Sequence, residues 1–227
     1  MIQVEHICKQ YTNHHHTVHA VNDVSFSVAP NERVGIAGGS GSGKSTLLRL
    51  MAMLEKTTSG TVRLFGEDVT SIQNHRDIYQ SMQMMFQNPL AIIPPRMNLE
   101  AFMLEPYINY GLMDVASAKE DICKWIQHVD LPESIVQKYP HEVSGGQLQR
   151  VVLARIMLMH PKLVLFDEPT SALDAVNQKL VLDLLQKLYQ EQPFGYVFVS
   201  HDIGLLQAVT DRIIVMKDGH IVEIIES

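Results

Sequence analysis

The sequence has few of the features that mark secreted, membrane-spanning or nucleic-acid-binding proteins. Its two cysteines, Cys8 and Cys123, match no metal or redox spacing, which favours a reduced, cytosolic protein. Its longest unbroken apolar run, residues 50–54, is far shorter than the ~20 residues that cross a bilayer, and Glu5 interrupts the region of a signal peptide. Acidic residues outnumber Lys and Arg by 25 to 18. We therefore expect no membrane span, no secretion and no nucleic-acid partner.

The composition that remains is that of a folded globular protein. The chain has 227 residues, of which 46% are hydrophobic and 19% are charged. A chain of this length buries ~70–75% of the surface that it exposes when unfolded, which excludes disorder as its main state. The length allows one large domain or a core that carries a subdomain.

The first third of the chain predicts strands around one strand–loop–helix unit. Residues 24–28 alternate apolar and small polar side chains, which predicts an antiparallel strand with one solvated face. Residues 33–37 predict a short buried strand, which a Gly/Ser-rich turn and a helix follow, and residues 61–65 and 82–86 predict further strands. The apolar face of the expected helix consists of Leu47, Leu48, Met51 and Leu54.

The rest of the chain predicts helices followed by a parallel sheet. Periodicity is mostly helical from about residue 99 to residue 159. Strand-like segments at 163–167, 196–200 and 213–216 are separated by expected helices of about 15 and 8 residues, which favours an α/β fold with a mainly parallel, doubly covered sheet. Asp218-Gly219 predicts a hairpin turn before residues 220–225.

A phosphate-binding loop is predicted between the buried strand and the helix. The segment fits the pattern G-x-x-x-x-G-K-[ST] and reads Gly38-Gly39-Ser40-Gly41-Ser42-Gly43-Lys44-Ser45. Its glycines allow backbone N–H groups to converge on phosphate oxygens, Lys44 can reach the β- and γ-phosphates, and Ser45 can ligate Mg²⁺. A flexible Gly/Ser turn is the plain alternative. A dinucleotide fold is disfavoured because G-x-G-x-x-G is not satisfied.

Two carboxylates end the apolar segment 163–166. Asp167 can supply the acid on the metal side of a magnesium–nucleotide site, and Glu168 can polarise an attacking water molecule. A solvated strand end is the alternative for this pair alone. The phosphate loop upstream favours hydrolysis.

A third segment, Ser144-Gly145-Gly146-Gln147, precedes a helix with apolar residues on one face. Ser144 is the expected N-cap of that helix, and the glycines permit close approach of an anion. Taken alone, the segment predicts only a helix start.

The three segments together, in this order, resemble the ATP-binding subunit of ABC transporters over nearly the whole chain. The resemblance implies a P-loop NTPase (RecA-like) core with an antiparallel N-terminal β portion and a helical subdomain. It also implies a single domain over residues 1–227, with 1–87 and 161–227 as the nucleotide-binding core and 88–160 as the helical subdomain. The implied ligands are ATP and Mg²⁺, and the implied reaction is ATP hydrolysis that powers transport.

The resemblance also assigns roles to residues outside the phosphate loop. Gln87 corresponds to the Q-loop glutamine, which reaches magnesium partly through water, and Asp174 corresponds to the D-loop aspartate. His201 corresponds to the switch histidine beside the γ-phosphate. Thr46 joins the phosphate loop, and Tyr11 corresponds to an aromatic residue that stacks on adenine, with a buried strand-end tyrosine as the alternative.

The signature Ser144-Gly145-Gly146-Gln147 is expected to close over a nucleotide that a second ATPase subunit holds. Importers of the peptide and nickel class have segments like Phe86-Gln87-Asn88-Pro89, Pro95-Arg96-Met97 and Tyr139-Pro140-His141-Glu142. This finer resemblance implies a paralogous partner in a heterodimer, two permease subunits, an indirect extracellular solute-binding protein and a place on the cytoplasmic face of the cell membrane. The cargo, a peptide, nickel or another metal chelate, stays open.

Four alternatives are weaker. A polymer-clamping ABC ATPase would carry long coiled coils or basic grooves, and a regulatory module without turnover would lack Glu168 or His201. The histidines at 14–16 and 19 suggest a metal site, but no Cys or acid joins them at ligand spacing. The 12 methionines, including Met82, Met84, Met85, Met97 and Met103, are expected to fill the core. Several flank Gln87, where a soft docking groove is the less favoured interpretation.

Overall fold

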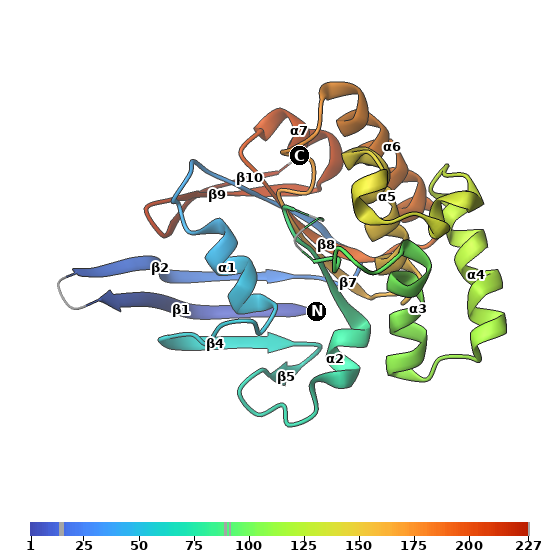
Figure 1. Ribbon diagram of the computed structural model, residues 1–227. Coiled ribbons are helices and arrows are strands. Elements are labelled where there is room, and N and C mark those ends of the chain that lie inside the picture. Colours follow the sequence, from blue (N-terminus) through green and yellow to red (C-terminus); the bar gives the residue numbers. More distant parts are fainter. Residues whose placement is uncertain (14–15, 89, 91, 227) are drawn as a thin grey trace. The chain divides into compact units, whose positions relative to one another are not determined.

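The computed structural model describes residues 1–13, 16–88, 90 and 92–226. It consists of two compact units (Figure 1). The first unit contains Met1–Met84, Lys162–Glu168 and Pro193–Ser227, and the second contains Met85–Pro161 and Pro169–Gln192. The predicted division at residues 88–160 stays a prediction, and the second unit also includes a helix beyond residue 160.

An antiparallel sheet of four strands forms part of the first unit (Figure 1). Its order is β2 (His16–Val28), β1 (Ile2–Asn13), β4 (Ser59–Leu64) and β5 (Glu67–Asp68). The strand predicted at 24–28 is the end of β2, and it is antiparallel to β1. Val24 and Val28 are buried while Ser25 and Ser27 are exposed, which confirms the predicted solvated face.

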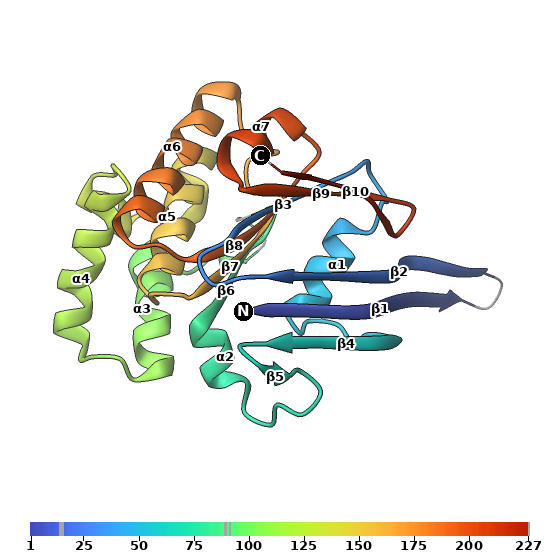
Figure 2. The same ribbon diagram turned by 180° about the vertical axis from the view of Figure 1, so that it is seen from behind.

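A second sheet has six strands and is mainly parallel. Its order is β10 (His220–Glu226), β9 (Arg212–Lys217), β3 (Arg33–Ala37), β8 (Gly195–Ser200), β7 (Leu163–Asp167) and β6 (Met82–Met85). β3 is parallel to both β8 and β9, and β7 is parallel to β8. β10 returns antiparallel to β9 after Asp218-Gly219, which confirms the predicted hairpin. Figure 2 shows both sheets from behind.

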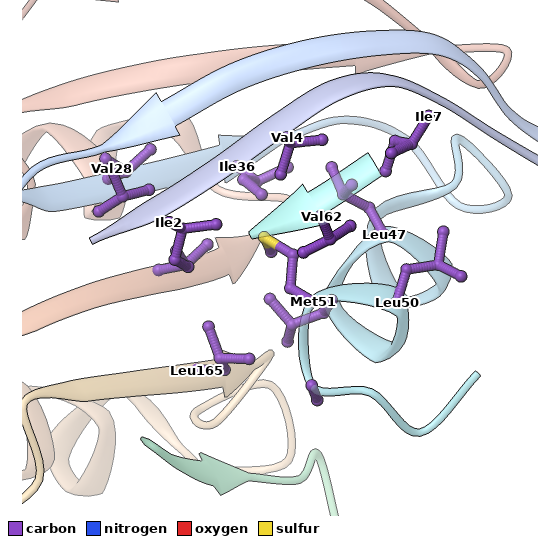
Figure 3. Packing of buried hydrophobic residues seen from close by; sticks show 14 of the residues in the cluster. Ile2, Val4, Ile7, Val28, Ile36, Leu47, Leu50, Met51, Val62 and Leu165 are labelled. Atoms are coloured by element: carbon purple, nitrogen blue, oxygen red, sulfur yellow. The ribbon is translucent and has the colours of Figure 1, made fainter. Parts of the chain in front are cut away.

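The first unit has three helices in the described part of the chain: α1 (Lys44–Met51), α2 (His75–Ser81) and α7 (Ile203–Val209). Leu47, Leu50 and Met51 of α1 are buried in the core that both sheets share (Figure 3). The prediction that Leu54 belongs to this apolar face was wrong, because Leu54 is 50% exposed. The helix has already ended, and Met53 adopts a left-handed conformation with φ of 58°.

The second unit is helical, as predicted for residues 99–159. It contains α3 (Leu99–Tyr110), α4 (Val115–His128), the 3₁₀ turns Glu133–Gln137 and Pro140–Glu142, α5 (Gly145–Met157) and α6 (Ala175–Glu191). Arg155 of α5 joins α3: its guanidinium lies 4.4 Å from the ring centroid of Phe102 and donates a 2.7 Å hydrogen bond to Glu105. Across the described residues, no helix combines the length and apolar character needed to cross a membrane.

Candidate functional site

The predicted phosphate loop lies between the end of β3 and the start of α1, as the motif requires. Gly43 has a φ of +99°, and a Cβ atom at this position would lie 2.1 Å from the carbonyl oxygen of Ala20. Only glycine therefore fits where the loop enters the helix. The N-terminus of α1 is the positive end of the helix dipole, where an anion is stabilised.

The Lys44 side chain folds back over this loop. Its ammonium donates hydrogen bonds of 2.8 and 2.9 Å to the carbonyl oxygens of Gly38 and Gly39, and the residue is only 5% exposed. Ser42 Oγ is buried and has no hydrogen-bond partner within the described part of the chain. A buried cation and a buried free hydroxyl in a glycine-rich loop fit a phosphate ligand.

Ser45 and Asp167 form the centre of the site. Ser45 Oγ donates a 2.9 Å hydrogen bond to Asp167 Oδ1 at the end of β7. Burial raises the pKa of Asp167 and nearby Glu168 adds to this, although the Ser45 hydrogen bond and the charges of Arg49 and Lys44 oppose it. A hydroxyl and a carboxylate in contact are the hard oxygen ligands that Mg²⁺ takes, so the residues present fit a magnesium ion.

Glu168 and His201 lie at the same edge of the parallel sheet. Glu168 Oε2 is 3.9 Å from His201 Nδ1, and the His201 side chain is 67% exposed. Glu168 has a φ of 45°, a left-handed conformation that costs a non-glycine residue ~1–3 kcal/mol and that clusters at functional sites. Its backbone N–H donates to Val199 of the adjacent strand, which holds the residue in this conformation. A carboxylate and a histidine together can position water and move its proton.

Tyr11 lies on β1 and is 40% exposed, so it is not the buried core tyrosine that was the alternative. Its hydroxyl donates a hydrogen bond to Glu55 and also interacts with the side chain of Thr46 on α1. Burial of the hydroxyl and the hydrogen bond to Glu55 raise the pKa of Tyr11. The ring therefore lies beside the phosphate-loop helix with one face held near Lys9, whose Nζ is 5.0 Å from the ring centroid.

The signature segment starts α5 in the second unit. Ser144 Oγ accepts from Gln147 N at 3.3 Å, and Gln147 Oε1 accepts from Ser144 N at 3.0 Å. This reciprocal capping confirms Ser144 as the N-cap. Gly146 packs tightly against Asn177 of α6, because a Cβ atom at Gly146 would lie 2.6 Å from Asn177 Oδ1.

Asp174 and Gln87 also lie in the second unit. Asp174 caps α6 by accepting hydrogen bonds from Val176 N at 3.0 Å and Asn177 N at 2.9 Å. Hydrogen bonds from Asn177 hold the pKa of Asp174 below its usual value. Gln87 Nε2 donates a 3.3 Å hydrogen bond to Ser171 Oγ, so the predicted Q-loop glutamine contacts the segment before Asp174.

The suggested histidine metal site lies partly outside the described residues, which omit His14 and His15. His19 Nδ1 is 3.3 Å from Gln10 Nε2. No group of three or more His, Cys, Asp or Glu residues in the described ranges is arranged to hold a metal ion. Of the five methionines named above, Met82, Met85 and Met103 are buried, as expected of core residues, whereas Met84 and Met97 are half-buried.

Sequence reasoning missed Glu55, Lys9 and Asn177. Glu55 and Lys9 hold Tyr11, and Asn177 joins Asp174 to Gly146. None of the three belongs to a motif used above, and Glu55 meets Tyr11, and Asn177 meets Gly146, only in the folded chain.

The phosphate loop, the Ser45–Asp167 pair and the parallel sheet define the class of P-loop nucleotide-binding proteins. Residues 21–171 match the family described as ABC transporter, and the chain belongs to this family. The predicted α/β fold with a P-loop core is confirmed by solved structures: the dimeric ATP-binding cassette MJ0796 in a post-hydrolysis state, bound to ADP and Pi, has a TM-score of 0.90 and 28% identity, covering 100% of this chain and 98% of that chain.

Curated relatives come from bacterial transport systems. The oligopeptide transport ATP-binding protein AppF of Bacillus subtilis is 37% identical over 210 residues, covering 91% of this chain and 64% of that protein. The di/tripeptide transport ATP-binding protein DppF of Pseudomonas aeruginosa is 38% identical over 207 residues, covering 90% and 64%. The chain thus spans less than two thirds of the length of these relatives.

Proposed function

We propose that this chain is the ATP-binding and ATP-hydrolysing subunit of a transporter that imports peptides. The observation that carries the proposal is the convergence of Lys44, Ser45, Asp167, Glu168 and His201 around the phosphate loop. Relatives named for oligopeptide and di/tripeptide transport support peptides as cargo. Nickel or another metal chelate is the alternative cargo.

The phosphate loop binds the substrate phosphates. Backbone N–H groups of residues 38–46 donate to the phosphate oxygens, and the Lys44 ammonium exchanges its bonds to two loop carbonyls for bonds to phosphate. Ser42 Oγ, buried without a partner among the described residues, gains an acceptor. Ser45 and Asp167 hold Mg²⁺, which when bound neutralises charge on the phosphates.

Glu168 acts on the attacking water. Its carboxylate orients the water and accepts its proton, a contribution of ~10²–10⁴-fold for a well-placed general base. His201 lies 3.9 Å from this carboxylate. Its imidazole donates a hydrogen bond to the γ-phosphate that the water attacks. Tyr11 stacks on the base of the nucleotide.

The second-unit residues act toward a partner. Ser144, Gly145, Gly146 and Gln147 bind the nucleotide held by a second ATPase subunit, and Asp174 approaches the same interface. Gln87 would couple the site to the permease and would help to hold magnesium, partly through water. The dimeric ATP-binding cassettes among the solved structures support this sandwich.

The proposed assembly pairs the chain with a paralogous ATPase subunit, although it can form a homodimer in isolation. Two permease subunits hold the pair at the cytoplasmic face of the membrane, and an extracellular solute-binding protein acts indirectly. Residues 1–227 serve as one ATPase domain in this assembly.

The substitution Glu168→Gln tests the proposal, because it keeps the size of the side chain and removes its charge. We expect Mg·ATP affinity to persist while turnover falls ~10²–10⁴-fold. In sedimentation, ATP but not ADP should shift the variant to twice its mass, since a ligand that binds only the closed dimer stabilises it. Glu223→Gln, at an exposed position on β10, is the matched control and should hydrolyse normally. Turnover near the parent rate in Glu168→Gln would contradict the assigned role.

A further inference from the structure

A carboxylate that belongs to no motif lies among a hydroxyl and two cations beside the phosphate-loop helix. Glu55 follows α1 and accepts a hydrogen bond from the hydroxyl of Tyr11. Its carboxylate lies 3.4 Å from Lys9 Nζ and 3.7 Å from Arg49 Nη1. Lys9 and Tyr11 come from β1 and Arg49 from α1, so this cluster joins the antiparallel sheet to the helix that begins at the phosphate loop.

We propose that Glu55 is a positioning residue that orients the ring of Tyr11 for stacking on the base of a nucleoside triphosphate. The inference rests on the proposed function, because it assigns a role toward the same substrate. Glu55 itself does not touch the nucleotide; it acts through the Tyr11 hydroxyl.

The ring needs an anchor because of where it lies. Tyr11 is 40% exposed and lies two residues before the end of β1, so the core of the sheet does not enclose its ring. A tyrosine ring that is free to change rotamer must be ordered when a base stacks on it, which weakens binding. The hydrogen bond to Glu55 and the interaction with Thr46 order it in advance.

The carboxylate is itself well fixed. The Glu55 side chain is 23% exposed and the Lys9 side chain only 16%. Lys9 Nζ also donates a 2.8 Å hydrogen bond to the carbonyl oxygen of Lys56, which fixes the ammonium beside the carboxylate. Burial raises the pKa of Glu55, but hydrogen bonds from Tyr11 and Lys9 outweigh it, so the net pKa lies below the usual value and the group is charged at neutral pH. A charged carboxylate held by these contacts can keep the hydroxyl of Tyr11, and with it the ring, in one orientation.

The position of Lys9 also sets the side from which the base approaches. Its ammonium lies 5.0 Å from the ring centroid, a cation–π distance, and covers one face of the ring. The base must therefore use the opposite face. Stacking reads no base edge, so the class of ligand is a nucleoside triphosphate with an aromatic base, with ATP and GTP affected alike.

The experiment compares steady-state hydrolysis of Mg·ATP and Mg·GTP by single and double variants. Glu55→Ala should raise KM about 2- to 10-fold for both nucleotides and leave kcat unchanged. This is the fold-change in affinity that corresponds to the loss of one aromatic contact. Glu55→Gln still accepts a hydrogen bond and should restore KM. Tyr11→Phe removes the same hydrogen bond and should resemble Glu55→Ala, and combining the two should raise KM no further.

A matched control separates positioning from a structural effect. Glu5→Ala breaks another ion pair of the same sheet, between Glu5 and Arg63 at 3.4 Å, and should leave KM unchanged. The proposal is overturned if Glu55→Ala lowers only the unfolding temperature, if Glu55→Gln fails to restore KM, or if the double variant shows additive effects. A parent protein that neither binds nor hydrolyses Mg·ATP would instead refute the proposed function.

Discussion

Two adjacent glycines in the signature segment should respond in opposite ways to the same substitution. A Cβ atom at Gly146 would lie 2.6 Å from Asn177 Oδ1 and 2.9 Å from Asn177 Cγ. At Gly145 the nearest atom would be Leu173 Cδ2 at 3.9 Å, an ordinary contact. Gly146→Ala must therefore displace Asn177, whereas Gly145→Ala displaces nothing.

The difference in unfolding free energy follows from this geometry. Both residues open α5, so replacing glycine by alanine improves helix propensity by a similar amount, up to ~1 kcal/mol, and this gain cancels between the variants. Overpacking at Gly146 costs ~1–3 kcal/mol. Moving Asn177 also strains its 2.6 Å hydrogen bond to Asp174 Oδ2, so its amide cannot turn away freely. Gly146→Ala should be less stable than Gly145→Ala by ~1–3 kcal/mol.

Urea unfolding of the two variants measures this difference, and thermal unfolding should separate them by roughly 2–4 °C for each kcal/mol. In an Asn177→Ala background the gap should shrink, because the atoms that clash most are gone and the Asn177 Cβ lies at 3.3 Å. Equal stability of Gly145→Ala and Gly146→Ala would refute the reasoning. So would a gap that survives removal of the Asn177 amide.

Two further predictions concern the phosphate loop. Lys44→Met should abolish Mg·ATP binding in calorimetry while circular dichroism stays unchanged, because the ammonium bonds only to loop carbonyls in the contacts described above; retained affinity would contradict its assignment. Burial raises the pKa of Asp167, so the folded chain holds this proton more tightly than the unfolded chain, and stability falls as pH rises from the unfolded pKa through the folded pKa. Asp167→Asn should therefore raise the unfolding midpoint at pH 7 and flatten its pH dependence, while Mg·ATP affinity drops; an unchanged or lower midpoint would count against this view.

The strands that carry the chemistry could be predicted closely from the sequence. The segments expected at 33–37 and 163–167 are β3 and β7 with the same bounds. Residues 34–37 of β3 and 163–166 of β7 are runs without a polar side chain, and they end at Gly38 of the phosphate loop and at Asp167. A buried parallel strand produces such a run by itself. The loop after β3 was equally clear, because its backbone binds the ligand and its glycines are local requirements.

The elements that were not predicted have weak or broken patterns. β1 has register shifts between Val4 and Ile7 and between Ile7 and Lys9, and His6 has a φ of 49°, so the alternation of a strand is interrupted. The seven-residue helix α2 buries only Ile78, which leaves no helical periodicity to detect. Both segments are held by contacts with the rest of the fold, and their own sequence patterns are too weak to predict them.

Residues that contact the ligand and residues that hold them differ in how far their partners lie along the chain. The phosphate loop acts through consecutive backbone groups, so its spacing is a local property that a short motif captures. Glu55 meets Tyr11 across 44 positions, and only the pairing of β1 with its neighbours decides that they meet. A motif therefore locates the phosphates but not the orientation of the base, and substitutions at Glu55 should reveal function that no motif marks.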